Sequence, residues 1–523
     1  MTKVQEAEMK IITLIVVFYL CTADLLHAQT VLYSPEVGNA ASTQFEMIGR
    51  VNNFYWIIKS KKNYNARNTE PWINDKSVSF EVYNQRMNKI KTLPSFIAGN
   101  TIKEYFFAGN NYFDQLEFIN DDGIKILITR YTPDGNLVYS GKQLNMFKGN
   151  IRGDDFLFLR SQDKSKNVFF ALETNKDELP KLHTFLYDNN WNILLENVYE
   201  DHNLTQPFVQ YDFINHPSDF FDNAPAKLTN NGDWLMLSPS RENNNYVLFH
   251  FHNIDSSITY NEIKLNKNAV VENLSLSLNN KEGEAFAGVL TNTKYEAVKK
   301  AHIAHYILSE CRLDFDTTYL FKPVAADKAR DENLSEQYFM PVMDKGFIFL
   351  KEYGRPYMQS FSFSQENIND DTNSAVDFKN IAVAVNENDY TRFNSLADSR
   401  PKYDRGDLSF YFFPALKDDS SWSGIINKEQ TNDLNAAYLS YICMPLDGKL
   451  VFLYNSMFNN DDKYSSTTIV DEKGNALNEG VVFWKAKNTM NFQKARQISA
   501  QELIIPYEKN RWQGFAVIRL SSD

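Results

Sequence analysis

The sequence predicts an all-β fold built from small antiparallel sheets that repeat along the chain. One cassette recurs: a polar or glycine start, a run of β-forming residues, a polar turn and a second, aromatic-rich run. Phenylalanine, tyrosine and tryptophan make up 14% of the residues, which is typical of strands packed on both faces. Weak self-similarity of this kind is the sequence signature of a repeat architecture.

The cassette occurs in four clear copies and one looser copy. Its first runs lie at 155–159, 233–237, 346–350 and 448–453, with the looser copy at 283–290. The second runs follow at 166–171, 246–251, 357–363 and 464–470. A four-stranded propeller blade takes about 40–50 residues in tight repeats. The longer intervals therefore require insertions, which we expect at 203–231 and 365–404.

Earlier strands and hairpin turns extend the pattern towards the start of the chain. Short β-branched and aromatic runs predict strands at 54–59, 78–83, 105–108, 112–118 and 124–131. In the segments 131–137, 187–193 and 470–476, an aspartate opens a turn, and a glycine or asparagine accepts the left-handed conformation that closes it. We therefore expect a β-propeller of about seven four-stranded antiparallel blades, with six or eight as alternatives.

The last apolar run is expected to close the ring. Residues 514–520 read as a strand, and we expect it to pair near 45–59. A terminal strand that completes a blade leaves no unpaired edge between the ends of the chain. The prediction is thus a propeller closed by its C-terminal strand.

The pattern resembles the broad β-propeller superfamily over most of residues 30–520. The Trp-Asp pairs of WD40 repeats are absent, as is the Ser-x-Asp-x-Gly-x-x-Trp box of sialidase-like propellers, of which 445–449 keeps only the aspartate and a displaced glycine. The resemblance therefore implies a fold, and no enzymatic family's residues can be carried over.

The start of the chain predicts export. Residues 11–20 form an apolar run that is too short to span a bilayer but suits a secretory signal. We expect a signal peptide at 1–28, with the true start at Met9, and a single propeller-like domain at 29–523 without a transmembrane segment. A buried N-terminal element, or lipidation at Cys21, is the alternative. The expected location is periplasmic or extracellular.

Charge and cysteine content narrow the possible partners. The formal net charge is −12, which argues against nucleic acid, because such proteins carry a basic footprint. Cys311 and Cys443 remain after the leader, either as a disulfide or, as we favour, as two buried thiols. Their spacing matches no zinc motif, so we expect no metal and no cofactor.

Histidine pairs are the next candidates for chemistry. His250 and His252 lie two apart on a probable strand and so face one side. A metal site would need a third ligand, and we favour histidines that are solvated or satisfied in the core. The spacing of His302 and His305 suits a helix better than a strand.

Carboxylates offer two further possibilities. Asp188, Asn190 and Asn192 have the first three spacings of a calcium loop, but turn-forming hydrogen bonds explain them equally well. Paired carboxylates in the funnel of a propeller could cleave a glycoside. No Gly-x-Ser-x-Gly or His-Glu-x-x-His motif occurs, so we assign no catalytic residue and favour a non-catalytic role.

Two places are candidate binding sites. Tyr353, Arg355 and Tyr357 are expected in an exposed loop at one end of the propeller, where tyrosine and arginine are typical binding anchors. Trp422 lies between small residues and is a second candidate; packing between blades is the alternative. The sequence thus favours an exported propeller that binds a protein or glycan. The alternatives are a glycoside hydrolase or lyase using funnel carboxylates, and a structural part of a cell-envelope assembly.

Overall fold

The computed structural model describes the chain in a series of segments. The described residues are 30–38, 43–61, 79–94, 101–121, 123–147, 156–173, 178–201, 204, 225–240, 245–266, 268–293, 299–321, 336–342, 346–357, 402–415, 421–428, 430–432, 441–446, 449–458, 462–482, 489–509 and 512–520. The predicted signal peptide at 1–28 lies outside them. Among the described residues, no helix has the length and apolarity needed to cross a membrane.

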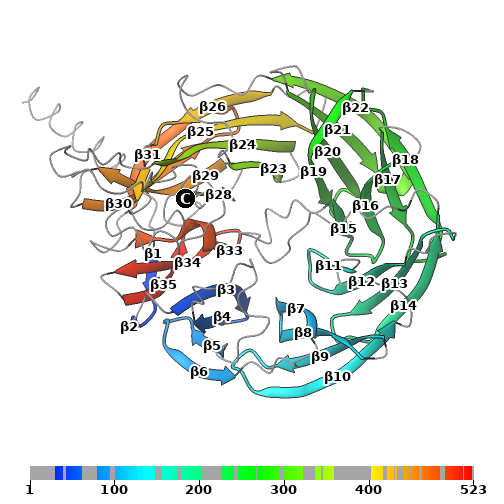
Figure 1. Ribbon diagram of the computed structural model, residues 1–523, viewed down its shortest axis with the longest axis horizontal. Coiled ribbons are helices and arrows are strands. Elements are labelled where there is room, and N and C mark those ends of the chain that lie inside the picture. Colours follow the sequence, from blue (N-terminus) through cyan, green and yellow to red (C-terminus); the bar gives the residue numbers. More distant parts are fainter. Residues whose placement is uncertain are drawn as a thin grey trace, which may run out of the picture.

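The described strands form eight antiparallel sheets that follow one another around a ring (Figure 1). The chain passes round the ring once, and each sheet stands as one blade, so the architecture is a β-propeller. The fold class predicted from the sequence is confirmed. The expected count of about seven blades is wrong, because there are eight sheets.

The first four blades each consist of four consecutive strands. Blade 1 contains β3 (Thr43–Val51), β4 (Phe54–Lys61), β5 (Ser79–Asn84) and β6 (Lys89–Pro94). Blade 2 contains β7 (Thr101–Ala108), β8 (Phe113–Asn120), β9 (Ile124–Tyr131) and β10 (Leu137–Phe147). Blade 3 contains β11 (Phe156–Arg160), β12 (Lys166–Glu173), β13 (Lys181–Asp188) and β14 (Ile193–Glu200). Blade 4 contains β15 (Ala226–Leu228), β16 (Trp234–Pro239), β17 (Tyr246–Phe251) and β18 (Ile258–Ile263).

Blades 5 to 7 continue the pattern with two additions. Blade 5 contains β19 (Ala269–Asn279), β20 (Glu284–Thr293), β21 (Lys299–Ile307), the 3-10 helix η3 (Leu308–Glu310) and β22 (Arg312–Phe321). Blade 6 contains β23 (Glu336–Val342), β24 (Gly346–Tyr357), β25 (Lys402–Pro414), β26 (Trp422–Ile426) and the short β27 (Gln430–Asn432). Blade 7 contains β28 (Tyr441–Leu446), β29 (Lys449–Phe458), β30 (Asp462–Val470) and β31 (Ala476–Val482).

Blade 8 joins the two ends of the chain. It contains β32 (Thr489–Met490), the 3-10 helix η7 (Phe492–Lys494), β33 (Arg496–Ser499), β34 (Glu502–Lys509), β35 (Trp512–Arg519), β1 (Thr30–Tyr33) and β2 (Val37–Gly38). β1 and β2 both pair with β35. The predicted pairing of 514–520 with 45–59 is therefore wrong. The N-terminal strand covers the edge of β35 and closes the ring.

The repeated cassette corresponds to strands, but not always at the same position in a blade. The copies at 233 and 448 are the second and third strands of their blades, whereas the copy at 155 supplies the first and second. The run predicted at 357–363 is not the partner of β24, because β24 pairs with β25. Residues 358–401, with most of the insertion predicted at 365–404, lie outside the described residues, as does most of 203–231.

The core lies between neighbouring blades, where aromatic rings from both sides meet. Trp56 of blade 1 stacks on Phe113 of blade 2 with 4.0 Å between ring centroids. Trp234 of blade 4 stacks on Phe170 of blade 3 at 4.4 Å and on Phe251 of its own blade at 3.5 Å. Side chains of a strand alternate between the two faces of the sheet, so each blade buries both faces, as the high aromatic content requires.

Candidate functional site

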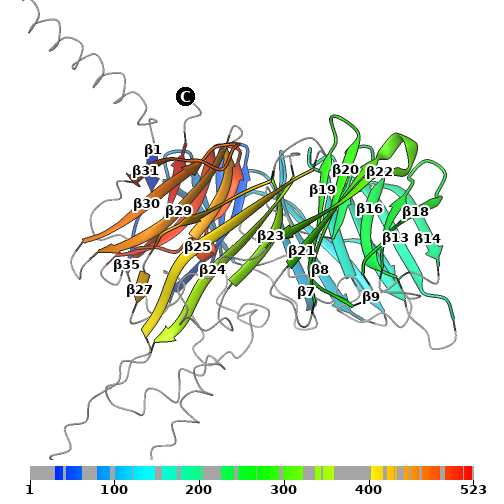
Figure 2. The ribbon, with the colours of Figure 1, turned by 90° about the horizontal axis from the view of Figure 1, so that it is seen from above.

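The segment predicted to be a binding loop is part of a long hairpin. β24 continues to Tyr357, and beyond an irregularity after Glu352 it pairs with the start of β25 as Arg355↔Asp404 and Tyr357↔Lys402. β27 adds a third strand on the outer side of β25. Figure 2 shows β24 and β25 extending past the neighbouring strands on one side of the ring. The prediction of a loop at 353–357 is wrong, because the backbone there is a strand. The side chains of Tyr353, Arg355 and Tyr357 are not among those that the structure describes.

Trp422, the second predicted binding residue, packs between two blades. It is half-buried at the start of β26, and its ring stacks on Phe412 with 4.8 Å between centroids. A Cβ added to Gly474, in the turn after β30 of blade 7, would come within 2.7 Å of the Trp422 ring. Packing therefore accounts for the position of this residue. Its role in ligand binding stays a prediction.

The predicted calcium loop forms a hydrogen-bonded turn. Asp188 Oδ1 accepts the backbone N–H groups of Asn190 and Asn192, each at 2.8 Å, and Oδ2 accepts the side-chain amide of Asn192 at 2.8 Å. Asp471 accepts the N–H groups of Lys473 and Asn475 in the same way. These carboxylates serve the turns, and the turn interpretation is the one that the hydrogen bonds support.

His302 and His305 lie on strand β21, so the helical spacing was misleading. His302 is buried between Thr291 Oγ1 at 3.2 Å and Thr318 Oγ1 at 3.0 Å, and burial lowers its pKa to about 4. His305 is buried between the carboxylates of Glu284 and Asp314, at 3.5 and 3.4 Å. The two histidines belong to the interior of blade 5 rather than to one shared site.

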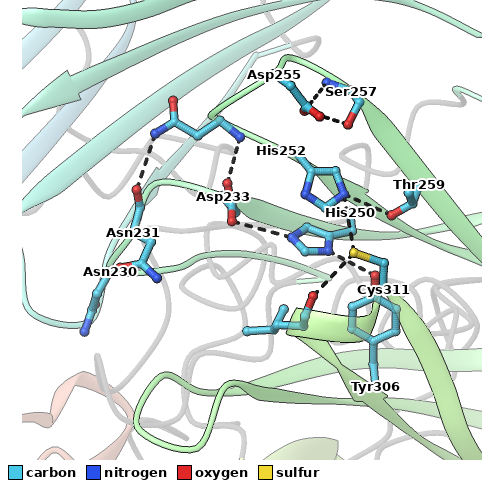
Figure 3. A network of polar contacts seen from close by, with 12 residues as sticks. Asn230, Asn231, Asp233, His250, His252, Asp255, Ser257, Thr259, Tyr306 and Cys311 are labelled. Atoms are coloured by element: carbon cyan, nitrogen blue, oxygen red, sulfur yellow. Dashed lines mark hydrogen bonds and ion pairs between the residues drawn. The ribbon is translucent and has the colours of Figure 1, made fainter.

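His250 and His252 meet Cys311 at the junction of blades 4 and 5 (Figure 3). His250 belongs to β17, His252 follows that strand, and Cys311 lies in the turn between η3 and β22. One donor atom from each lies within 4.8 Å of the other two. The sequence predicted no cysteine–histidine cluster. It missed this one because the third residue comes from the neighbouring blade.

The turns on both sides of the junction are fixed by hydrogen bonds. The N–H of His252 donates to Ser257 O at 2.9 Å, and the carboxylate of Asp255 accepts the Ser257 N–H and hydroxyl groups. The Asn261 side-chain amide donates across the junction to Cys311 O at 3.1 Å. Cys311 has a left-handed backbone with φ of 52°. These contacts hold both turns against each other.

The donor atoms of the cluster lie close together. Cys311 Sγ is 3.7 Å from His252 Nε2, which is also 3.2 Å from Thr259 Oγ1. The rings of His250 and His252 have centroids 4.0 Å apart. His250 Nδ1 lies 3.0 Å from the Tyr306 hydroxyl. The arrangement offers two imidazoles and a thiol, with two hydroxyl groups beside them.

The surroundings keep the imidazole of His252 neutral. Burial, with the neighbouring His250 ring, lowers the pKa of His252. Burial acts to raise the pKa of Asp233, but His250 and the Asn253 N–H at 2.7 Å outweigh it and lower that pKa. Burial also raises the pKa of the Tyr306 hydroxyl. A neutral imidazole has a free lone pair, which is the form that ligates a metal or accepts a proton.

Several buried carboxylates of the blades are held by basic groups. Asp114 Oδ1 accepts a hydrogen bond from Arg130 Nε at 2.7 Å, and Glu81 Oε1 lies 3.2 Å from Lys89 Nζ. Glu352 pairs with Lys428, and both side chains are almost fully buried. An acid for glycoside cleavage needs a raised pKa beside a second free carboxylate. These three carboxylates do not form such a pair.

Comparison with known proteins gives matches of fold alone. No protein-family model and no curated protein matches the sequence. A structure from a study of two prolyl endopeptidases matches with 8% identity and a TM-score of 0.35, over 89% of this chain and 45% of that one. A eukaryotic initiation factor matches with 10% identity and a TM-score of 0.34, over 93% and 99%. The β-propeller domain of the Trilobed protease from Pyrococcus furiosus matches with 8% identity and a TM-score of 0.29, over 80% and 95%.

Proposed function

We propose that the chain is an exported, non-catalytic β-propeller that binds a protein or a glycan in the periplasm or outside the cell. The observation that carries the proposal is the extension of blade 6. Residues 346–352 pair with 408–414 within the blade, and 354–357 then pair with 402–405 beyond it. A register irregularity between Glu352 and Gly354 separates the two ladders, and bulges of this kind are over-represented at sheet edges and beside active sites.

The extension of blade 6 is a three-stranded ribbon on which a ligand could bind. It has three strands, because β27 pairs with Tyr403, Asp404 and Arg405 of β25. Binding residues are typically carried by segments that a rigid scaffold positions. The sequence places Tyr353, Arg355 and Tyr357 in this ribbon, and tyrosine and arginine are enriched among residues that dominate binding energy.

Three buried carboxylates are held by basic groups and give no support to hydrolysis. Asp114, Glu81 and Glu352 are committed to basic partners inside or beside the blades. Freeing Asp114 or Glu352 for acid–base catalysis would break a buried ion pair, which costs about 3–5 kcal/mol. These three carboxylates therefore give no support to the alternative function as a glycoside hydrolase or lyase. The apolar run at 11–20 supports export.

A binding screen tests the proposal. The chain starting at Gln29 is applied to a glycan array, and then to candidate cell-envelope proteins if no glycan binds. We expect a saturable ligand whose affinity falls when Tyr353, Arg355 and Tyr357 are changed together to alanine. Tyr260→Ala is the matched control, because this tyrosine is 56% exposed on the outer strand of blade 4. An equal loss in both variants would contradict the assignment.

A further inference from the structure

The cluster at the junction of blades 4 and 5 has the composition of a metal site. We propose that His250, His252 and Cys311 bind a thiophilic transition-metal ion, either zinc or copper. Imidazole nitrogen and thiolate sulfur are the donors that these ions prefer. The inference goes beyond ligand binding and does not rest on the extension of blade 6.

The distances between the donors suit one ion. In a tetrahedral zinc site with bonds of about 2.1 Å to nitrogen and 2.3 Å to sulfur, nitrogen and sulfur lie about 3.6 Å apart. Cys311 Sγ and His252 Nε2 are 3.7 Å apart. The three donor atoms lie within 4.8 Å of one another, so small rotations of the side chains bring all of them into range.

A carboxylate behind His250 is a second, independent observation. His250 is only 2% exposed, and its Nε2 has no hydrogen-bond partner among the described residues. Asp233 Oδ2 lies 3.9 Å from that nitrogen, and Asp233 is itself fixed by the Asn253 N–H at 2.7 Å. Histidines that ligate a metal usually turn their other N–H towards a carboxylate. The arrangement thus assigns Nδ1 of His250 as the ligating atom.

Oxygen atoms flank the remaining side of the cluster. Tyr306 Oη lies 3.0 Å from His250 Nδ1, and Thr259 Oγ1 lies 3.2 Å from His252 Nε2. A fourth position between these hydroxyl groups could take one of them or a water molecule. Two histidines and one cysteine with an open fourth position is a ligand set found for both zinc and copper.

A cysteine nucleophile activated by His252 is the competing interpretation. The 3.7 Å contact between Cys311 and His252 also suits such a dyad. A dyad does not need a second histidine whose ring lies 4.0 Å from the first, backed by a carboxylate. A metal site uses both, the second histidine as a ligand and the carboxylate to orient it, which is why the geometry favours the metal.

Cobalt provides a direct probe of the site. Co²⁺ is titrated into the reduced, chelator-treated chain starting at Gln29, whose two cysteines are Cys311 and Cys443, and a thiolate-to-cobalt charge-transfer band is followed. We expect the band to saturate at one equivalent. It should disappear in Cys311→Ser and remain in Cys443→Ser, the matched control for the second thiol. Asp233→Asn should keep the band and weaken binding about 10- to 100-fold.

Competition and metal analysis then identify the ion. Zn²⁺ should displace Co²⁺ from the site, and the metal content of the protein before chelator treatment, measured by mass spectrometry, identifies the native ion as zinc or copper, because Cu²⁺ outcompetes Zn²⁺ at most such sites whichever ion is native. Circular dichroism of the Cys311→Ser and His250→Gln variants separates loss of the site from loss of the fold. The absence of a stoichiometric cobalt band in the correctly folded wild type would overturn the proposal. Rapid alkylation of Cys311 that neither ion slows would also overturn it, in favour of the nucleophile.

Discussion

Asp114 and Arg130 form a two-pronged ion pair inside blade 2, with Nε to Oδ1 at 2.7 Å and Nη2 to Oδ2 at 2.8 Å. Blade 3 completes it, because Trp191 Nε1 donates to Asp114 Oδ2 at 2.9 Å and Arg130 Nη2 donates to Asn189 O at 2.7 Å. The pair is thus shared between blades. Such shared polar contacts, together with the stacked rings, join neighbouring blades.

Breaking this ion pair should strongly destabilise the protein. We expect Asp114→Ala to lower the free energy of unfolding by about 3–5 kcal/mol, because it leaves a buried guanidinium without its carboxylate. Urea unfolding measures the change. Glu282→Ala is the control, since Glu282 pairs with Lys281 at the surface, where such pairs contribute about 0–1 kcal/mol. Equal losses in the two variants would show that Asp114 is not a link between blades.

Removal of β1 and β2 should open the ring. A chain that starts at Asn39 lacks the strands that cover β35 in blade 8. We expect a lower unfolding temperature and concentration-dependent association, because an uncovered edge strand can pair with another chain. The chain starting at Gln29 is the reference, and a peptide of residues 30–38 added in trans should restore part of the stability. Identical melting of the two chains would contradict closure by the N-terminal strand.

The contact between Gly474 and Trp422 can be isolated by a matched glycine substitution. Gly474 has φ of 83°, and a Cβ there would meet the Trp422 ring at 2.7 Å, whereas Gly283 has φ of 72° and open space around its Cβ position. Both Gly→Ala changes cost about 1 kcal/mol from backbone strain. We expect Gly474→Ala to cost more than Gly283→Ala. The excess should vanish in a Trp422→Ala background, as a thermal double-mutant cycle would measure; its persistence would contradict the packing role.

Acid should weaken the fold through His302. Its pKa is lowered to about 4 in the folded state, against about 6.5 in an unfolded chain. The unfolded state therefore binds the proton first, so the stability contributed by neutral His302 is complete above about pH 6.5 and is lost as the pH falls towards 4. The expected contribution is on the order of 3 kcal/mol. Urea unfolding at pH 7 and 4.5 should show a smaller difference for His302→Gln than for the wild type. An unchanged difference would exclude His302 as the source.

The sequence revealed the strands more reliably than their places in the ring. β4, β5, β8 and β9 lie where short runs of aromatic and β-branched residues predicted them. The blade count was one too low because the seven units recognised in the sequence lie one in each of blades 1 to 7, whereas 514–520 was expected to pair near 45–59 and belongs instead to an eighth blade. β1 was not predicted: its sequence Thr-Val-Leu-Tyr suits a strand, but the run has only four residues and follows directly on the predicted signal peptide.

The candidate metal site shows why contacts between residues far apart in the sequence could not be predicted from local patterns. His250 and His252 were visible as a pair because their spacing is local. Cys311 is 59 residues from His252 and joins it only because blades 4 and 5 are neighbours. The pairing of 354–357 with 402–405 was hidden for the same reason: a polar segment separates the partners, and the Tyr-Gly-Arg-Pro-Tyr sequence is typical of a loop.

The measurement that tests the proposed function most directly joins binding to product analysis. The best ligand from the screen is titrated against the wild type and the Tyr353/Arg355/Tyr357 triple alanine variant, and the ligand is then recovered and analysed by mass spectrometry. We predict saturable binding, an intact ligand, and an affinity at least about 30-fold lower in the variant, the loss typical of one binding hot spot. Cleavage of the ligand by the wild type, or equal affinity of the two proteins, would contradict the account.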